Sequence, residues 1–105
     1  MLDIQLDKKG DGCVRIRLVG LVDIHSSPAL RQKLHPLFTS DQREIHMDLS
    51  GVTFMDSSGI ATLVEGLQWS RNYSAKFTLA GLTEPVRDVF AMSKLDTVFD
   101  IAEGP

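Results

Sequence analysis

The sequence has 105 residues, of which 43% are hydrophobic, and this length supplies enough apolar material for one domain with one core. Its 11 basic and 14 acidic residues give a formal charge of −3 and are mixed along the chain, which disfavours nucleic acid as a partner. The first ten residues carry acids where a signal peptide would carry a basic segment, and the apolar runs are short. We therefore expect a single cytoplasmic domain over residues 1–105 with no membrane insertion.

Two alternating segments open the chain and predict a β-hairpin. Leu2, Ile4 and Leu6 alternate with polar residues, and the same alternation resumes over residues 14–18 after the turn residues 9–12. The turn contains two glycines, which favour a tight reversal. We expect two neighbouring strands here.

The next segment has the signature of a helix start. The run Ser26-Ser27-Pro28 offers a hydroxyl to cap free amides and a proline just inside the helix, and Leu30, Leu34 and Leu37 follow at helical spacing. Pro36 has no amide hydrogen, so we expect it to kink or end this helix.

The middle of the chain contains a third strand and a second helix. Ile45, Met47 and Leu49 alternate with polar residues, and residues 50–59 connect this strand to the helix. The apolar residues of that helix repeat at positions i, i+3, i+4 and i+7: Ile60, Leu63, Val64 and Leu67. This spacing predicts one stripe buried against the sheet.

Residues 76–80 read as a further strand, Thr83-Glu84-Pro85 opens a third helix, and residues 98–101 form a short closing strand. The predicted order is β-β-α-β-α-β-α-β. Strands that alternate with helices predict an α/β fold, with a mixed sheet of about four to five strands and helices packed mainly on one face.

The segment from Phe54 to Gly59 is the first candidate for a functional site, because binding residues of open α/β sheets gather where a strand passes into a helix. Either Ser57 or Ser58 can cap the following helix, and free amides there also suit an added phosphate. Gly59 has no side chain, which would let another protein's active site approach the serine hydroxyl. The commoner role of a serine at such a turn is only that of a cap.

The other reactive side chains indicate neither a metal site nor a cofactor. The single cysteine, Cys13, and the three histidines, His25, His35 and His46, lie on separate elements without metal-ligand spacing. No glycine-rich nucleotide loop occurs. The nucleophile turn of a serine hydrolase has the pattern Gly-x-Ser-x-Gly. The run Met55-Asp56-Ser57-Ser58-Gly59 lacks the first glycine and has an acid before the serine, so we do not expect an enzyme.

The residues from Asp48 to Ile60 closely resemble the phosphorylation segment of STAS-domain anti-sigma factor antagonists, in which "D-L-S … F-M-D-S-S-G-L" is the hallmark. Residues from Ile16 to Asp23 resemble the second strand of that family, and those from Gly81 to Leu95 resemble its last helix. The resemblance covers nearly the whole chain.

This resemblance implies a partner switch. In that family the unphosphorylated antagonist binds an anti-sigma factor that is also a serine kinase, and so releases a sigma factor. The serine after the aspartate, here Ser57, is the phosphoacceptor, and a metal-dependent serine phosphatase removes the phosphate. By the same resemblance Asp23, Asp56, Ser58 and Gly59 are partner-binding residues, although Asp23 is equally explained as a turn or helix-entry aspartate.

Two alternatives remain at this point. The chain could be a constitutive STAS subunit of another regulatory or transport complex, in which Ser57 is not phosphorylated and serves only as a cap. A small hydrolase or transferase would need a base within hydrogen-bond reach of Ser57. Leu21 and Ala61 depart from the commoner residues of the family, glutamate and glycine, and this difference bears on the identity of the partner.

Overall fold

The computed structural model describes residues 1–102, and the predicted domain boundary at residue 105 lies outside them. The elements are β1 (Leu2–Gly10), β2 (Cys13–Val22), α1 (Ser27–Thr39), β3 (Glu44–Met55), α2 (Ser57–Asn72), β4 (Lys76–Ala80), α3 (Glu84–Met92) and β5 (Asp100–Ala102). The predicted order of strands and helices is confirmed.

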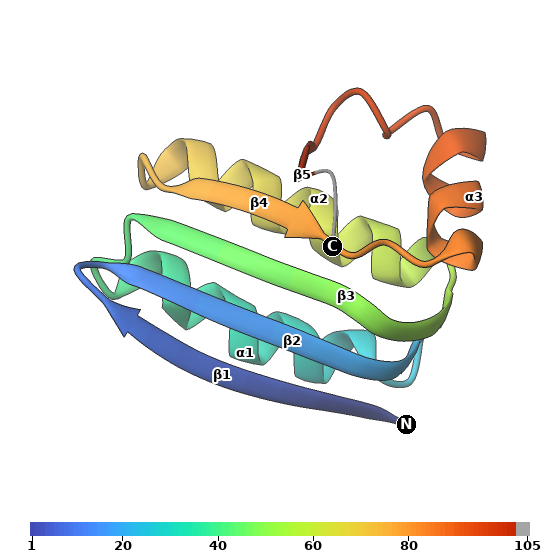
Figure 1. Cartoon of the computed structure of the whole chain (residues 1–105), viewed down its shortest axis with the longest axis horizontal. Coiled ribbons are helices and arrows are strands. Elements are labelled where there is room, and N and C mark those ends of the chain that lie inside the picture. The colour runs from blue at the N-terminus through green and yellow to red at the C-terminus, as the bar shows by residue number, and fades with distance from the viewer. Residues whose placement is uncertain (103–105) are drawn as a thin grey trace.

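The five strands form one mixed sheet in the order β1-β2-β3-β4-β5. The hairpin makes β1 antiparallel to β2, and its turn holds Gly10, Asp11 and Gly12 at positive φ, which glycine adopts without strain. The remaining strands pair in parallel, each joined to the next by a helix or by a helix and loop. The carboxyl ends of β2, β3 and β4 therefore meet at one edge, on the right in Figure 1.

Helices α1 and α2 lie side by side on one face of the sheet, and α3 lies near the carboxyl end of β3 (Figure 1). Among residues 1–102 no helix packs on the opposite face, which we call the bare face, so the prediction of helices mainly on one face is confirmed. The apolar residues buried between the layers include Val14, Ile16, Leu18, Leu30, Leu34, Ile45, Met47, Leu49, Leu63, Phe77, Leu79, Val86 and Phe90. Each such side chain contributes about 1.5–3 kcal/mol by leaving water.

The predicted apolar stripe of α2 faces this core. Ile60 and Leu63 are buried, and Val64 and Leu67 are partly buried against the same cluster. None of the described helices is both long and apolar enough to cross a membrane.

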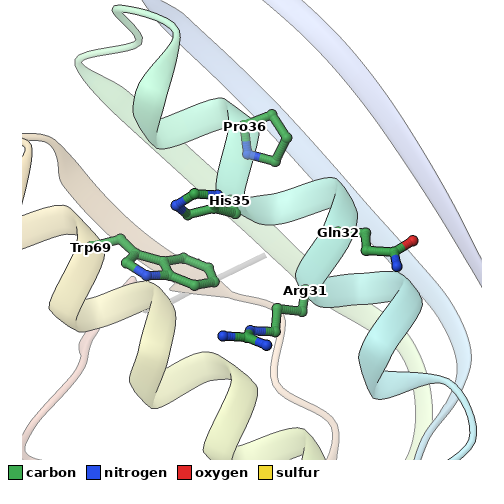
Figure 2. Close-up of a pocket in the computed structure, with 5 residues that line it drawn as sticks. All are labelled: Arg31, Gln32, His35, Pro36 and Trp69. Atoms are coloured by element: carbon green, nitrogen blue, oxygen red, sulfur yellow. The ribbon is translucent and has the colours of Figure 1, made fainter.

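A pocket lies between the outer surfaces of α1 and α2 and is lined by Arg31, Gln32, His35, Pro36 and Trp69 (Figure 2). The His35 and Trp69 rings lie 4.7 Å apart between centroids at 60°, and the Arg31 guanidinium forms an ion pair of 3.0 Å with Glu65. These contacts join the two helices above the core.

Two expectations about α1 need correction. The helix does not end at Pro36 but continues to Thr39, and a kink at Pro36 stays a prediction. Pro36 and Gln32 are both exposed, so the Gln32 carbonyl, which has no helical partner at Pro36, lies in an exposed turn of the helix. The hydroxyl of Ser26 does not cap the helix either. Instead it accepts a hydrogen bond from the Asp23 amide (3.0 Å) and donates one to the Leu21 carbonyl (2.8 Å).

Two strand boundaries also differ from the sequence prediction. β3 does not stop at Leu49 but runs on to Met55, so only Asp56 separates it from α2. The pairing of β2 with β3 shifts register twice, and the buried residues Val52 and Met55 fall three positions apart, which hides the alternation. β5 begins at Asp100 rather than at residue 98.

Candidate functional site

Two loops meet at the carboxyl edge of the sheet, because β2 and β3 are parallel neighbours. The loop after β2 leads into α1, and Asp56 after β3 leads directly into α2. The Asp56 amide donates a hydrogen bond of 3.1 Å to the carbonyl of Val22, the last residue of β2. The end of β2, where the first loop begins, and the start of α2 are therefore adjacent.

Asp56 is the cap of α2. Its backbone is extended, and its Oδ1 accepts hydrogen bonds from the amides of Ser58 (2.9 Å) and Gly59 (3.3 Å). The sequence predicted that Ser57 or Ser58 fills this position, which is wrong. The amides expected to be free for a phosphate are thus already bonded to the Asp56 carboxylate.

The same contacts fix the charge of Asp56. The Ser58 hydroxyl donates a hydrogen bond to Oδ1, and this bond, helped by backbone amides, outweighs the effect of burial and lowers the pKa of Asp56 below its ordinary value. Asp56 is therefore a carboxylate at neutral pH, at the positive end of a helix.

The two neighbouring serines differ in what their hydroxyls contact. Ser58 is half-buried, and its hydroxyl is bonded to Asp56. Ser57 is exposed, and within residues 1–102 its hydroxyl has no hydrogen-bond partner. Ser57 is thus the serine whose hydroxyl a second protein can reach.

Asp23 lies directly after β2 and organises its own loop. Its Oδ1 accepts hydrogen bonds from the amides of His25 (2.9 Å) and Ser26 (3.1 Å). Burial raises the pKa of Asp23, but these amides and the Ser26 hydroxyl together lower it further, so the net pKa lies below its ordinary value. The interpretation of Asp23 as a turn aspartate agrees with these contacts, and its role in partner binding stays a prediction.

Gly59 faces the interior of the molecule. A Cβ at this position would lie 2.7 Å from Val22 Cγ1 and 2.8 Å from Met55 Cγ. The structural requirement for glycine is therefore the close approach of α2 to the ends of β2 and β3, rather than open access to the serine. A contact between Gly59 and a partner stays a prediction.

Sequence reasoning missed an apolar rim around this edge. Leu21 and Phe54 are paired across β2 and β3 and are 38% and 47% exposed, and Ile24 in the first loop is 68% exposed. We refer to Leu21, Ile24 and Phe54 as the apolar rim. Leu21 was noticed only as a departure from the family pattern, and the register shifts concealed the outward direction of Phe54.

Comparisons with known proteins place this chain in a family. The chain matches the family model described as "Mlab, STAS domain" over residues 4–101. It is 26% identical over 102 residues to the anti-sigma-B factor antagonist of Bacillus subtilis (strain 168), a match that covers 96% of this chain and 93% of the relative.

Solved structures give the same result. The anti-sigma factor antagonist SpoIIAA in its unphosphorylated form superposes with a TM-score of 0.82 at 25% identity, over 96% of this chain and 89% of that chain. The Bacillus cell fate determinant SpoIIAA in the phosphorylated form superposes with a TM-score of 0.75 at 24% identity, over 96% and 92%. These relatives are regulatory binding proteins rather than enzymes, in agreement with the sequence prediction. The predicted resemblance is confirmed, and the chain belongs to the STAS domain family.

Proposed function

We propose that this protein is a phosphorylation-controlled anti-sigma factor antagonist. In its unphosphorylated state residues 1–105 act as one cytoplasmic STAS domain that binds an anti-sigma factor, which is also a serine kinase, and so releases a sigma factor. The kinase phosphorylates Ser57, and a metal-dependent serine phosphatase restores the binding form.

The observation that carries this proposal is the difference between the two serines. Ser57 is exposed with an unbonded hydroxyl within the described residues, whereas the hydroxyl of Ser58 is held by Asp56. A similar protein, SpoIIAA, exists in unphosphorylated and phosphorylated forms. The first fact favours Ser57 over Ser58 as the phosphoacceptor, and the second supports phosphorylation as the means of control.

The charges at the site supply a physical basis for the switch. A phosphoserine carries about −1.5 to −2 at neutral pH. The amides of Ser58 and Gly59 are occupied by Asp56, so the first turn of α2 offers them to a phosphate only if Asp56 moves. The phosphate therefore adds its charge to that of an ionised Asp56 on the exposed surface.

The apolar rim makes this added charge costly for a bound partner. A partner that packs on Leu21, Ile24 and Phe54 removes water from the same surface, and burying an unpaired charge there costs about 2–5 kcal/mol. Since about 1.4 kcal/mol corresponds to a tenfold change, the affinity falls by well over tenfold.

The alternatives find less support in the contacts. A constitutive STAS subunit would use Ser57 as a helix cap, but Asp56 holds that position. A hydrolase would need a base bonded to Ser57, and among residues 1–102 no side chain forms such a bond.

Phosphorylation is tested with the serine kinase encoded nearest to this gene. The full chain is incubated with that kinase and ATP, and the phosphate is located by peptide mass spectrometry. We expect modification of Ser57 and none in Ser57→Ala. Modification confined to Ser58, or none while the kinase phosphorylates another substrate, would contradict the proposal.

Binding to the same kinase is measured by calorimetry with three variants. Ser57→Ala should bind like the unmodified protein, Ser57→Asp should bind at least about tenfold more weakly, and Asp23→Ala should bind more weakly while remaining folded. Asp41→Asn, in the turn before β3 at the opposite edge, is the control; it removes a carboxylate at a position of positive φ that asparagine tolerates, and should not change affinity. Equal affinity of Ser57→Ala and Ser57→Asp would remove the charge switch.

A further inference from the structure

A second group of reactive side chains lies at the other end of β2 and β3, at their amino ends. Cys13 is the first residue of β2 and is paired with Glu44, the first residue of β3. His46 follows Glu44 by two positions and thus points to the same face of the sheet. Because Ile45 and Met47 face the helices, these three side chains lie on the bare face.

The three ligand atoms are close together. The Cys13 sulfur, a Glu44 carboxylate oxygen and a His46 ring nitrogen all lie within 4.8 Å of one another, and Glu44 Oε2 is 3.4 Å from His46 Nε2. From this geometry we propose that Cys13, Glu44 and His46 form a Zn²⁺ site with a fourth, open coordination position.

The donor set selects the metal class. Zn²⁺ accepts thiolate, imidazole and carboxylate ligands, at about 2.3, 2.0–2.1 and 2.0–2.2 Å, in tetrahedral geometry. These bond lengths place ligand atoms about 3.3–3.7 Å apart, so the cluster must contract by about 1 Å. None of the three side chains is buried, and rotation of their side-chain bonds is enough for this movement. Hard cations such as Mg²⁺ and Ca²⁺ would not use the thiolate and imidazole.

The neighbouring cations do not fill the site. Arg15 lies beside His46 but is paired with Asp48 at 2.7 Å, and the Arg43 guanidinium donates to the Asp11 carbonyl at 2.8 Å. Lys76 lies in register with Glu44 on the neighbouring strand β4, and among residues 1–102 the two side chains form no ion pair.

Binding changes the protonation of the ligands. Zn²⁺ displaces the thiol proton of Cys13 to solvent and binds the neutral form of His46. The bound ion would link β2 to β3 at the edge opposite Ser57, so the site is independent of the proposed phosphorylation.

The spacing of the residues along the sequence gave no sign of this site. His46 and Cys13 were assigned no role because they lie on separate elements, and parallel pairing of β2 with β3 brings them together. Finding this site required knowing which residues of β2 and β3 lie opposite each other, and the spacing of residues along the sequence does not give that pairing.

The site is tested by titrating the reduced full chain with Co²⁺, which replaces Zn²⁺ and has visible and near-ultraviolet absorption. Cys13 is the single cysteine of the chain, so a thiolate-to-cobalt charge-transfer band can arise only from this residue. We expect one Co²⁺ per chain, tetrahedral visible bands, and displacement of Co²⁺ by Zn²⁺. No charge-transfer band, or one ion per two chains, would overturn the proposal.

Variants separate the ligands from their surroundings. Cys13→Ser should abolish the charge-transfer band. Loss of an outer partner of a metal ligand costs about 10- to 100-fold in affinity, so loss of a ligand in Glu44→Gln or His46→Gln should cost at least as much. His25→Gln, a histidine in the loop after β2, is the control and should leave the titration unchanged. Circular dichroism establishes that each variant is folded, and unchanged affinity in folded His46→Gln would overturn the proposal.

Discussion

The connections after β2 and after β3 both begin with an aspartate whose carboxylate accepts hydrogen bonds from nearby backbone amides, but the serine that follows is placed differently in each. Asp23 accepts hydrogen bonds from the amides two and three residues further on, and Asp56 does the same. In the first loop the following serine, Ser26, is buried and bonded back to the strand end. In the second, α2 starts at once and Ser57 is exposed at its first position.

The position of the helix start explains this difference. After Asp23 three residues intervene before α1. This length lets the chain turn back so that the Ser26 hydroxyl bonds to the Asp23 amide. After Asp56 no residue intervenes, so the capping bonds go to Ser58 and Gly59 and bypass Ser57. The same type of aspartate contact thus accompanies a buried serine hydroxyl after β2 and an exposed serine hydroxyl after β3.

The largest effect on this arrangement should come from filling the space at Gly59. In Gly59→Ala the new methyl group would lie within 3 Å of Val22 and Met55 side-chain atoms, and 3.1 Å from the Val22 carbonyl oxygen. Overpacking of this kind costs about 1–3 kcal/mol, and the nearby backbone puts the expected loss at about 3 kcal/mol. Urea unfolding followed by circular dichroism measures it. A loss below about 0.5 kcal/mol would show that α2 is not held closely against the strand ends.

A smaller loss is expected from opening the first loop. Ser26→Ala leaves the Leu21 carbonyl and the Asp23 amide without the hydroxyl that bonds both in a buried position. The loss of these bonds costs about 1–2 kcal/mol of unfolding free energy. Urea unfolding of Ser26→Ala beside Ser93→Ala, an exposed serine after α3, provides the measurement and its control. Equal stability of the two variants would contradict the assigned role of Ser26.

The charge on Asp56 should show itself as a dependence of stability on pH. Its folded-state pKa lies below the unfolded value, so the stabilisation is complete above about pH 4 and is lost as the pH falls through the folded-state pKa. Asp56→Asn keeps an acceptor but removes the charge at the helix end, which is worth about 0.3–1 kcal/mol.

Urea unfolding of both proteins at about pH 7 and about pH 3 measures this term. At about pH 7 the unmodified protein should be more stable than Asp56→Asn, and this difference in unfolding free energy should be smaller at about pH 3. A difference that stays constant, or grows, on acidification would contradict a lowered pKa of Asp56.

The regular parts of the fold could be predicted because their apolar residues repeat without interruption. Residues 76–80 were predicted with the bounds that β4 has, and the stripe from Ile60 to Leu67 faces the core. The continuation of β3 beyond Leu49 could not be predicted, because its pairing with β2 shifts register where Ser50 and Gly51 interrupt the alternation. The sequence left open whether Pro36 ends or kinks α1, and the helix continues to Thr39 because Pro36 has an exposed position in which its missing amide costs little.

The candidate site was predicted as a segment but not in its internal contacts. The place where β3 passes into α2 follows from the order of elements, and the family resemblance picks out Ser57 within it. Which residue caps the helix depends on where the strand ends, and the cap moved to Asp56 because β3 reaches Met55. The apolar rim depends on the same register shifts and was therefore missed.

The smallest expected effect is that of Ser57→Ala, and comparison with Ser58→Ala distinguishes the two serines of α2. The hydroxyl of Ser57 is exposed and unbonded within the described residues, so Ser57→Ala should change the free energy of unfolding by less than about 0.5 kcal/mol. Ser58→Ala removes the hydrogen bond to the charged Asp56 and should cost about 1 kcal/mol or more. The same contact lowers the pKa of Asp56, so Ser58→Ala should also weaken the loss of stability in acid, whereas Ser57→Ala should leave it unchanged. Urea unfolding of both variants at neutral and acid pH tests these expectations together. If Ser57→Ala were the more destabilising variant, the Ser57 hydroxyl would be bonded within the fold. It would then not be available to a kinase, which contradicts the proposed switch.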